Sequence, residues 1–279
     1  MSDSRSGVLV TVDEVADRVS DTARLVILDI SDDLDAAPLE RPVIPGPLAV
    51  SLASEFSGPP TKPGGRRPLP DAGALQENMR RWGIDAETFV VVYDNASGAQ
   101  AGRARWTLRW AGHASVNLLD GGLAAWIAAE HDTAAQPVHP AGSGGFTVKP
   151  GCMPVIEADE AAEIAHHGAL LDARGKSAYE GEADKPATDH IPGAICVAAL
   201  NTPGPDGCFK STEELRALFA ELGAAGSQLA GVYCGSDNAA AFELAGLYAA
   251  GREAPLYVGS WSAWTGYPAR PVANGPERG

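Results

Sequence analysis

Short apolar runs alternate with longer amphipathic segments along the whole chain. The runs Phe89–Tyr93 and Leu229–Tyr233 are rich in apolar residues, a pattern typical of strands that are covered on both faces of a parallel sheet. Segments with helical spacing lie between such runs, and Ser211 or Thr212 is placed to cap one of them before EELRALFAEL. Because strands and helices alternate, we predict an α/β fold in which a mostly parallel sheet is flanked by helices.

The two halves of the chain contain predicted elements of the same kinds. In the first half they are a helix at Ala72–Trp82, a strand at Phe89–Tyr93, a helix at Gly98–Ala111 and a strand at Val116–Leu119. In the second half they are a helix at Glu157–Ala165, a strand at Ala169–Ala173, a helix at Ser211–Leu222, a strand at Leu229–Tyr233, a helix at Asn238–Ala250 and a strand at Pro255–Val258.

Short motifs also occur twice, in the same order and at a nearly constant separation. The matched pairs are Asp29 and Asp172, 143 residues apart, Val43 and His190, 147 apart, Tyr93 and Tyr233, 140 apart, and Trp126 and Trp264, 138 apart. A constant separation of this kind indicates duplication. We therefore predict two tandem domains, residues 1–135 and 155–279, joined by a linker at 136–154 that is rich in Pro and Gly.

The composition excludes several classes of partner. The chain has 279 residues and a formal net charge of −15, from 21 Lys plus Arg against 36 Asp plus Glu. Such a surface repels nucleic acid and anionic lipid, so we expect neither a nucleic-acid nor a membrane partner. The apolar runs are shorter than the roughly 20 residues that cross a bilayer. Met1–Val8 is polar and lacks a signal-peptide core, so we predict a cytoplasmic location.

Ligands of parallel α/β sheets bind beyond the carboxyl ends of the strands. This rule selects the loops that follow Tyr93 and Tyr233. The second loop begins with Cys234, a candidate nucleophile, and continues through five candidate binding residues, Gly235, Ser236, Asp237, Asn238 and Ala239. Loop amides and a helix N-terminus favour a thiolate over a thiol. The first loop has Asp94 in the corresponding place and is expected to be inert.

The tandem halves, the HIPGA segment at His190–Ala194, the VYCGS loop and the GSWSAW ending at Trp264 resemble the two-domain rhodanese family, over nearly the whole chain. This family comprises thiosulfate and 3-mercaptopyruvate sulfurtransferases. The resemblance implies a ping-pong reaction in which Cys234 attacks the outer sulfur of a small anionic donor and becomes a persulfide. The sulfur then passes to cyanide, a thiol or a protein acceptor. The resemblance also implies an inactive first domain.

This sequence departs from the family pattern around the predicted site. Asp237 stands where the family has glycine, and Ala239 lacks the hydroxyl found there. A carboxylate this close is expected to raise the pKa of Cys234 and to oppose a bound anion. In the family two arginines before the HIPGA segment hold the donor's anionic group; here these two donor-binding positions are Ala178 and Glu180, whereas Arg174, at the start of the same motif, is kept and is a candidate binding residue. Four basic residues are candidates to replace them: Lys176, Lys185, Arg66 and Arg67.

These departures leave a second hypothesis open, a weakly active or inactive homologue that acts as a sulfur carrier or a protein-interaction module. A Cys-based phosphatase is disfavoured because the first arginine after Cys234 is Arg252, too distant to grip phosphate from the same loop. We expect no cofactor and no metal, since the sequence has no glycine-rich dinucleotide motif, no P-loop and no metal-ligand spacing. His190 is expected to orient a loop, and Asp29 and Asp172 to act as structural hydrogen-bonding groups.

Overall fold

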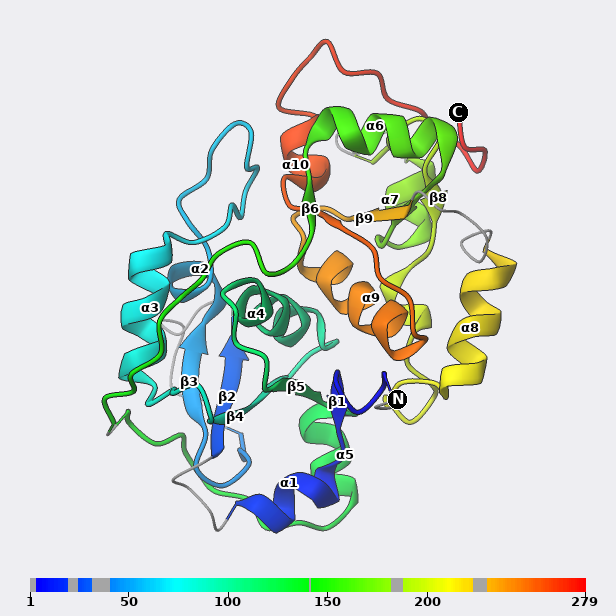
Figure 1. The fold of residues 1–279 in the computed structure, drawn as a ribbon. Helices are drawn as coiled ribbons and strands as arrows, with labels where there is room; N and C mark the ends of the chain where they lie inside the picture. Colours follow the sequence, from blue (N-terminus) through cyan, green and yellow to red (C-terminus); the bar gives the residue numbers. More distant parts are fainter. Residues whose placement is uncertain (1–3, 20–24, 32–40, 141, 182–187, 223–229) are drawn as a thin grey trace. The chain divides into compact units, whose positions relative to one another are not determined.

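The computed structural model describes residues 4–19, 25–31, 41–140, 142–181, 188–222 and 230–279 (Figure 1). The chain divides into two compact units. The first comprises Met1–Gly58, Pro70–Met153 and Pro203–Phe209, and the second comprises Pro59–Leu69, Pro154–Thr202 and Lys210–Gly279. Each unit therefore takes a short segment from the other half of the sequence. Nothing in the repeat pattern marked these two segments, and the boundaries at 135 and 155 stay a prediction.

The first unit is built on a parallel sheet. Its elements are β1 (Leu9–Val10), α1 (Val12–Arg18), β2 (Leu25–Ser31), β3 (Leu48–Ser51), α2 (Leu52–Glu55), α3 (Ala72–Arg81), β4 (Phe89–Asp94), α4 (Ala99–Trp110), β5 (Val116–Leu119) and α5 (Gly122–Ala128). The strand order is β1-β5-β4-β2-β3. In the central register Leu28 of β2 lies between Val92 of β4 and Leu48 of β3. The parallel order requires a crossover between paired strands, and helices supply most of these.

The second unit repeats this arrangement. Its elements are β6 (Val155–Ile156), α6 (Ala158–His167), β7 (Ala169–Asp172), α7 (Lys176–Glu180), β8 (Ile195–Cys196), the 3-10 turn η1 (Ala199–Asn201), α8 (Thr212–Glu221), β9 (Ala230–Tyr233), α9 (Asn238–Ala249), β10 (Leu256–Tyr257) and α10 (Ser260–Trp264). The strand order, β6-β10-β9-β7-β8, matches that of the first unit strand for strand. The predicted α/β fold with parallel sheets flanked by helices is confirmed.

Local sequence signals explain where the helices begin. Ser211 caps α8 and forms a reciprocal capping box with Glu214, as its position before EELRALFAEL predicted. Thr11 and Glu14 form the same motif at α1. The predicted elements match the observed ones to within a residue or two at most ends; Leu229, the predicted start of β9, lies outside the described residues.

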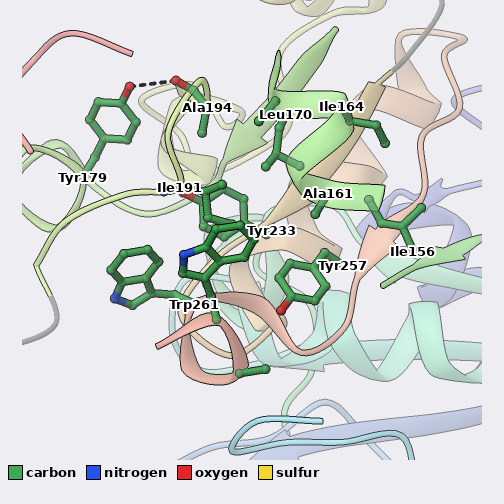
Figure 2. Close-up of a cluster of buried hydrophobic side chains, with 13 residues drawn as sticks. Ile156, Ala161, Ile164, Leu170, Tyr179, Ile191, Ala194, Tyr233, Tyr257 and Trp261 are labelled. Atoms are coloured by element: carbon green, nitrogen blue, oxygen red, sulfur yellow. Dashed lines mark hydrogen bonds between the residues drawn. The ribbon is translucent and has the colours of Figure 1, made fainter. Parts of the chain in front are cut away.

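Helices cover both faces of the second sheet. On one face, residues of α6, α7 and α10 pack with the strands in a buried cluster around Ile164, Leu170, Tyr233 and Trp261 (Figure 2). On the other face α9 contacts β9 and β10. Helix α9 is buried around almost its whole circumference, which fits its Ala-rich, apolar sequence. Within the described ranges, no helix has both the length and the apolar character that a membrane crossing requires.

The segment Pro59–Leu69 packs on α10 in the second unit. The backbone N–H of Arg66 donates to Ser262 Oγ at 3.0 Å. Gly65 has φ of +68°, and a Cβ atom there would lie 2.6 Å from the carbonyl oxygen of Gly259, so only glycine fits this contact. A segment that follows β3 and α2 in the sequence is thus fixed beside the last helix of the chain.

Candidate active site at the Cys234 loop

Cys234 lies directly after β9, where the chain turns from the sheet into α9. The start of α10 holds this turn through its backbone. The N–H of Trp261 donates to the carbonyl oxygen of Cys234 at 2.8 Å, and the N–H of Ser262 donates to that of Gly235 at 3.1 Å. Ser260 Oγ accepts from the N–H of Cys234 at 3.3 Å. The loop is therefore fixed to the start of α10 by three hydrogen bonds.

The Cys234 thiol is almost fully enclosed, with 3% of the residue exposed. Burial and the Asp237 carboxylate raise its pKa to about 11, although the backbone N–H groups of Ala240 and Ser236 act in the opposite direction. The amides thus favour the thiolate as expected, but burial outweighs them because it removes the charged form from water. Burial thus opposes the predicted preference for a thiolate, and the Asp237 carboxylate acts in the direction that the sequence predicts, raising the pKa of Cys234.

The corresponding loop of the first unit shows what this backbone can hold. Asp94 follows the same strand position, and its own carboxylate fills the loop. One oxygen accepts from the N–H groups of Ala96 and Gly98 at 2.9 Å, and the other accepts from those of Gln100 and Ala101 at 3.0 Å. The loop is therefore an amide cradle for an anion. In the second unit the residue at its centre is a cysteine.

The two loops have the same backbone conformation at the residue before the helix. Gly98 precedes α4 with φ of +82°, and Asp237 precedes α9 with φ of +69°. Glycine adopts this left-handed conformation freely, whereas it is unfavourable for a residue with a Cβ atom, and aspartate is among the few that tolerate it. Asp237 is also fully buried. A buried aspartate in the second unit therefore adopts the backbone conformation that the fold gives to glycine in the first.

Arg174 is occupied by a buried ion pair. Its Nε and Nη2 atoms donate to the two oxygens of Asp172 at 2.9 and 2.6 Å. Its guanidinium also lies over the ring of Trp261, 4.8 Å from the centroid. This geometry fixes the arginine against the end of the sheet, where it neutralises Asp172, and its predicted role in donor binding stays a prediction.

Two basic side chains that lie beside the loop within the second unit are Arg66 and Arg174; the Cδ atom of Arg174 would lie 4.0 Å from a Cβ atom placed on Gly235. A Cβ atom placed on Gly235 would lie 3.5 Å from Arg66 Nη2, and Arg66 is exposed. Arg67, the next residue, is half-buried, and its role stays a prediction. Lys185 lies outside the described residues. Lys176 pairs with Glu180 at 3.4 Å on the exposed side of α7.

The predicted structural roles of three polar residues are supported by their contacts. Asp29 accepts from Arg41 and Tyr93, and Asp172 pairs with Arg174 at the matching position of the second sheet. His190 is fully buried; its Nδ1 lies 2.8 Å from the carbonyl oxygen of Tyr179, and its ring stacks on that of Tyr179 at 3.8 Å. These groups shape the end of the sheet.

Two features of the site were missed. The positioning role of Ser260 and Ser262 could have been suspected from the repeated ending before Trp264. Glu243 is a fully buried acid in α9, signalled by one charge within AAAFELAGLYA. Among the residues that the structure describes, no group of three or more His, Cys, Asp or Glu side chains could hold a metal ion.

Comparison with known proteins gives consistent matches. The family model for the Rhodanese-like domain matches residues 11–129 and 157–267. The "Putative thiosulfate sulfurtransferase SseB" of Mycobacterium tuberculosis is 37% identical over 284 residues, 98% of this chain and 99% of that protein. The "Probable 3-mercaptopyruvate sulfurtransferase" of Pseudomonas aeruginosa is 38% identical over 289 residues, 97% and 99% of the two chains. The crystal structure of SseA from Escherichia coli, a 3-mercaptopyruvate sulfotransferase, superposes with a TM-score of 0.77 at 26% identity, covering 91% of this chain and 98% of that one.

Proposed function

This chain belongs to the rhodanese-like family, and on that premise we propose that it is a sulfurtransferase that uses Cys234. The donor is a small anion with a transferable sulfur, thiosulfate or 3-mercaptopyruvate. The acceptor is cyanide, a thiol or a protein thiol. The observation that carries the proposal is the pair of matched loops, one filled by the Asp94 carboxylate and one centred on a cysteine.

The first step loads sulfur onto the enzyme. The Cys234 thiolate attacks the outer sulfur of thiosulfate, a sulfur–sulfur bond forms to the enzyme, and the bond to the sulfonyl sulfur breaks, so that sulfite leaves with its electron pair. With 3-mercaptopyruvate the carbon–sulfur bond breaks, and the enolate of pyruvate leaves and takes up a proton. In the second step the acceptor attacks the terminal sulfur and the cysteine thiolate is restored.

The loop assists by holding negative charge on the transferred sulfur. The terminal sulfur of a persulfide would lie among loop amides of the kind that receive the Asp94 oxygens in the first unit. Arg66 adds a positive charge beside Gly235 and attracts the donor. A pKa of about 11 makes the Cys234 thiolate unfavourable by about 5 kcal/mol at pH 7. A nearby cation and the loop amides reduce this free-energy cost because they stabilise negative charge on sulfur.

A direct test is to measure the mass of the protein after incubation with thiosulfate. A gain of about 32 Da, one sulfur atom, is expected, and subsequent cyanide should remove it as thiocyanate. Cys234→Ser should abolish both the gain and turnover. Cys152→Ser, which removes an exposed thiol elsewhere, should leave them unchanged. Turnover that survives in Cys234→Ser would reject the proposal.

The same experiment separates an enzyme from a sulfur carrier. The absence of arginine at Ala178 and Glu180 favours slow loading from small donors. A carrier would load one sulfur from a protein persulfide and release it to a protein thiol, without multiple turnovers of thiosulfate and cyanide. Repeated turnover of these small molecules supports the enzyme.

A further inference from the structure

The segment Pro59–Leu69 is a basic strip on an acidic protein. It contains three basic residues, Lys62, Arg66 and Arg67, and no acidic residue, whereas the rest of the chain has 18 basic residues against 36 acidic ones. Pro59–Pro63 and Arg66 are exposed. A surface of one sign on a chain of the opposite sign attracts ligands that the rest of the surface repels.

Contacts with α10 and the residues after it hold this basic strip in place. The backbone N–H of Arg66 is bonded to Ser262 Oγ within the helix. Lys62 Nζ lies 4.7 Å from the centroid of the Tyr267 ring, a cation–π contact three residues beyond Trp264, the last residue of α10. Both cations are therefore arranged along the same helix.

A third cation nearby, Arg270, is balanced by an acid. Its guanidinium lies over the ring of Trp264, 4.7 Å from the centroid, and donates to Asp159 at 2.8 Å. The positive character of this surface thus comes from the basic strip.

The two cations of the strip have different neighbours. The Arg66 guanidinium lies beside Gly235 of the Cys234 loop, whereas Lys62 contacts Tyr267. An extended peptide advances about 3.3 Å per residue, so a segment of a few residues can pair with both cations. The arrangement fits an acidic peptide segment that leads to the thiol.

We propose that the basic strip docks an acidic segment of a protein that accepts sulfur from Cys234. This inference rests on the sulfurtransferase function proposed above and names the kind of acceptor. One carboxylate of the segment pairs with Lys62 and another with Arg66. The acceptor thiol loses its proton to solvent, and its sulfur attacks the terminal sulfur of the persulfide. A sulfur–sulfur bond forms to the acceptor, the bond to Cys234 breaks, and the electron pair returns to the Cys234 sulfur.

Two synthetic peptide thiols serve as probes for this docking. One is the acidic peptide Asp-Glu-Asp-Gly-Cys, and the other is its neutral counterpart Asn-Gln-Asn-Gly-Cys, both blocked at their ends. The enzyme is loaded with thiosulfate and freed of excess donor, and the rate of persulfide formation on each peptide is measured. The intrinsic reactivities of the two thiols differ, but this difference cancels when the ratio of the rates is compared between wild type and a variant.

The informative variants change the charge at Lys62. An exposed ion pair of this kind changes an association constant by about threefold, so Lys62→Gln should lower the preference for the acidic peptide about threefold. Lys62→Glu replaces the attraction by a repulsion and should lower it about tenfold. Lys149→Glu, the same reversal at an exposed lysine of the first unit, is the matched control and should leave the preference unchanged. All three variants should transfer sulfur to cyanide at the wild-type rate.

The outcomes distinguish this inference from the function on which it rests. A fall in the preference with both Lys62 variants, but not with Lys149→Glu, supports the docking surface. An unchanged preference in the Lys62 variants, with thiocyanate still formed, rejects the docking surface and leaves the sulfurtransferase function standing. A wild-type protein that takes up no sulfur rejects both. A wild-type dimer in light scattering that Lys62→Glu dissociates would assign the strip to a second copy of this chain and reject the docking of an acceptor.

Discussion

Glu243 gives a stability prediction whose sign follows from its burial. This acid lies in α9 with no exposed surface, and neither carboxylate oxygen has a hydrogen-bond partner among the residues that the structure describes. Burial, and secondarily the charge of Asp172, hold the pKa of Glu243 well above its usual range. The folded protein therefore keeps this carboxyl protonated at a pH where the unfolded chain has lost the proton.

The sign and the size of this stability effect follow from the coupling between folding and proton binding. A raised folded-state pKa contributes stability that is fully present below the ordinary value of 4.5 and is lost as the pH rises toward the raised pKa. Each pH unit in that window should lower the free energy of unfolding by about 1.4 kcal/mol relative to a variant without the group. Glu243→Gln keeps the shape and cannot ionise, so it should gain about 3 kcal/mol over wild type between pH 5 and pH 7.

The assay is urea unfolding of wild type and Glu243→Gln at pH 5, 6, 7 and 8, with constant ionic strength and tryptophan fluorescence as the signal. Glu213→Gln, an exposed change on α8, is the matched control and should follow wild type at each pH. If the stability difference between Glu243→Gln and wild type does not change with pH, Glu243 is not a proton-binding group of the folded state and the reasoning is refuted.

Three further predictions concern the loops. Asp237→Asn should lower the pKa of Cys234 by about one unit, measured as the pH dependence of alkylation by iodoacetamide; an unchanged profile would show that burial alone raises it. Arg66→Ala should raise the KM for thiosulfate about fivefold and leave the release of sulfur to cyanide unchanged, with Lys176→Ala as the control; an equal effect of both variants would place Arg66 outside the donor site. Asp94→Ala removes the acceptor of four backbone N–H groups and should destabilise the first unit by about 2–4 kcal/mol in urea unfolding, whereas a neutral result would mean that water replaces the carboxylate.

Local and repeated signals predicted the parts of the structure that depend on neighbouring residues. Ser211 caps α8 because the capping box is a pattern of four consecutive residues. Asp172 and Tyr233 lie at the ends of adjacent strands because each strand is a continuous apolar run. The loop that carries Cys234 followed from the rule that parallel strands present their ligands at their carboxyl ends.

The electrostatics of the site could not be predicted in the same way. The equilibrium between thiol and thiolate at Cys234 depends on how deeply the side chain is buried, which is a property of tertiary packing. Arg174 was expected to bind the donor; the structure shows that it pairs with Asp172, which the sequence did not reveal, and its part in donor binding stays a prediction. The approach of Arg66 to Gly235 joins residues separated by most of the chain, and no periodic pattern encodes such a contact.

The placement of Pro59–Leu69 has a consequence for how this duplicated chain can be dissected. The second compact unit needs these residues, although they precede the linker by many positions in the sequence. A gene fragment cut between the halves would deliver Cys234 without Arg66 and without the backbone that covers Ser262. The repeated motifs still show the duplication, but the two sequence halves do not coincide with the two compact units, because Pro59–Leu69 from the first half belongs to the second unit.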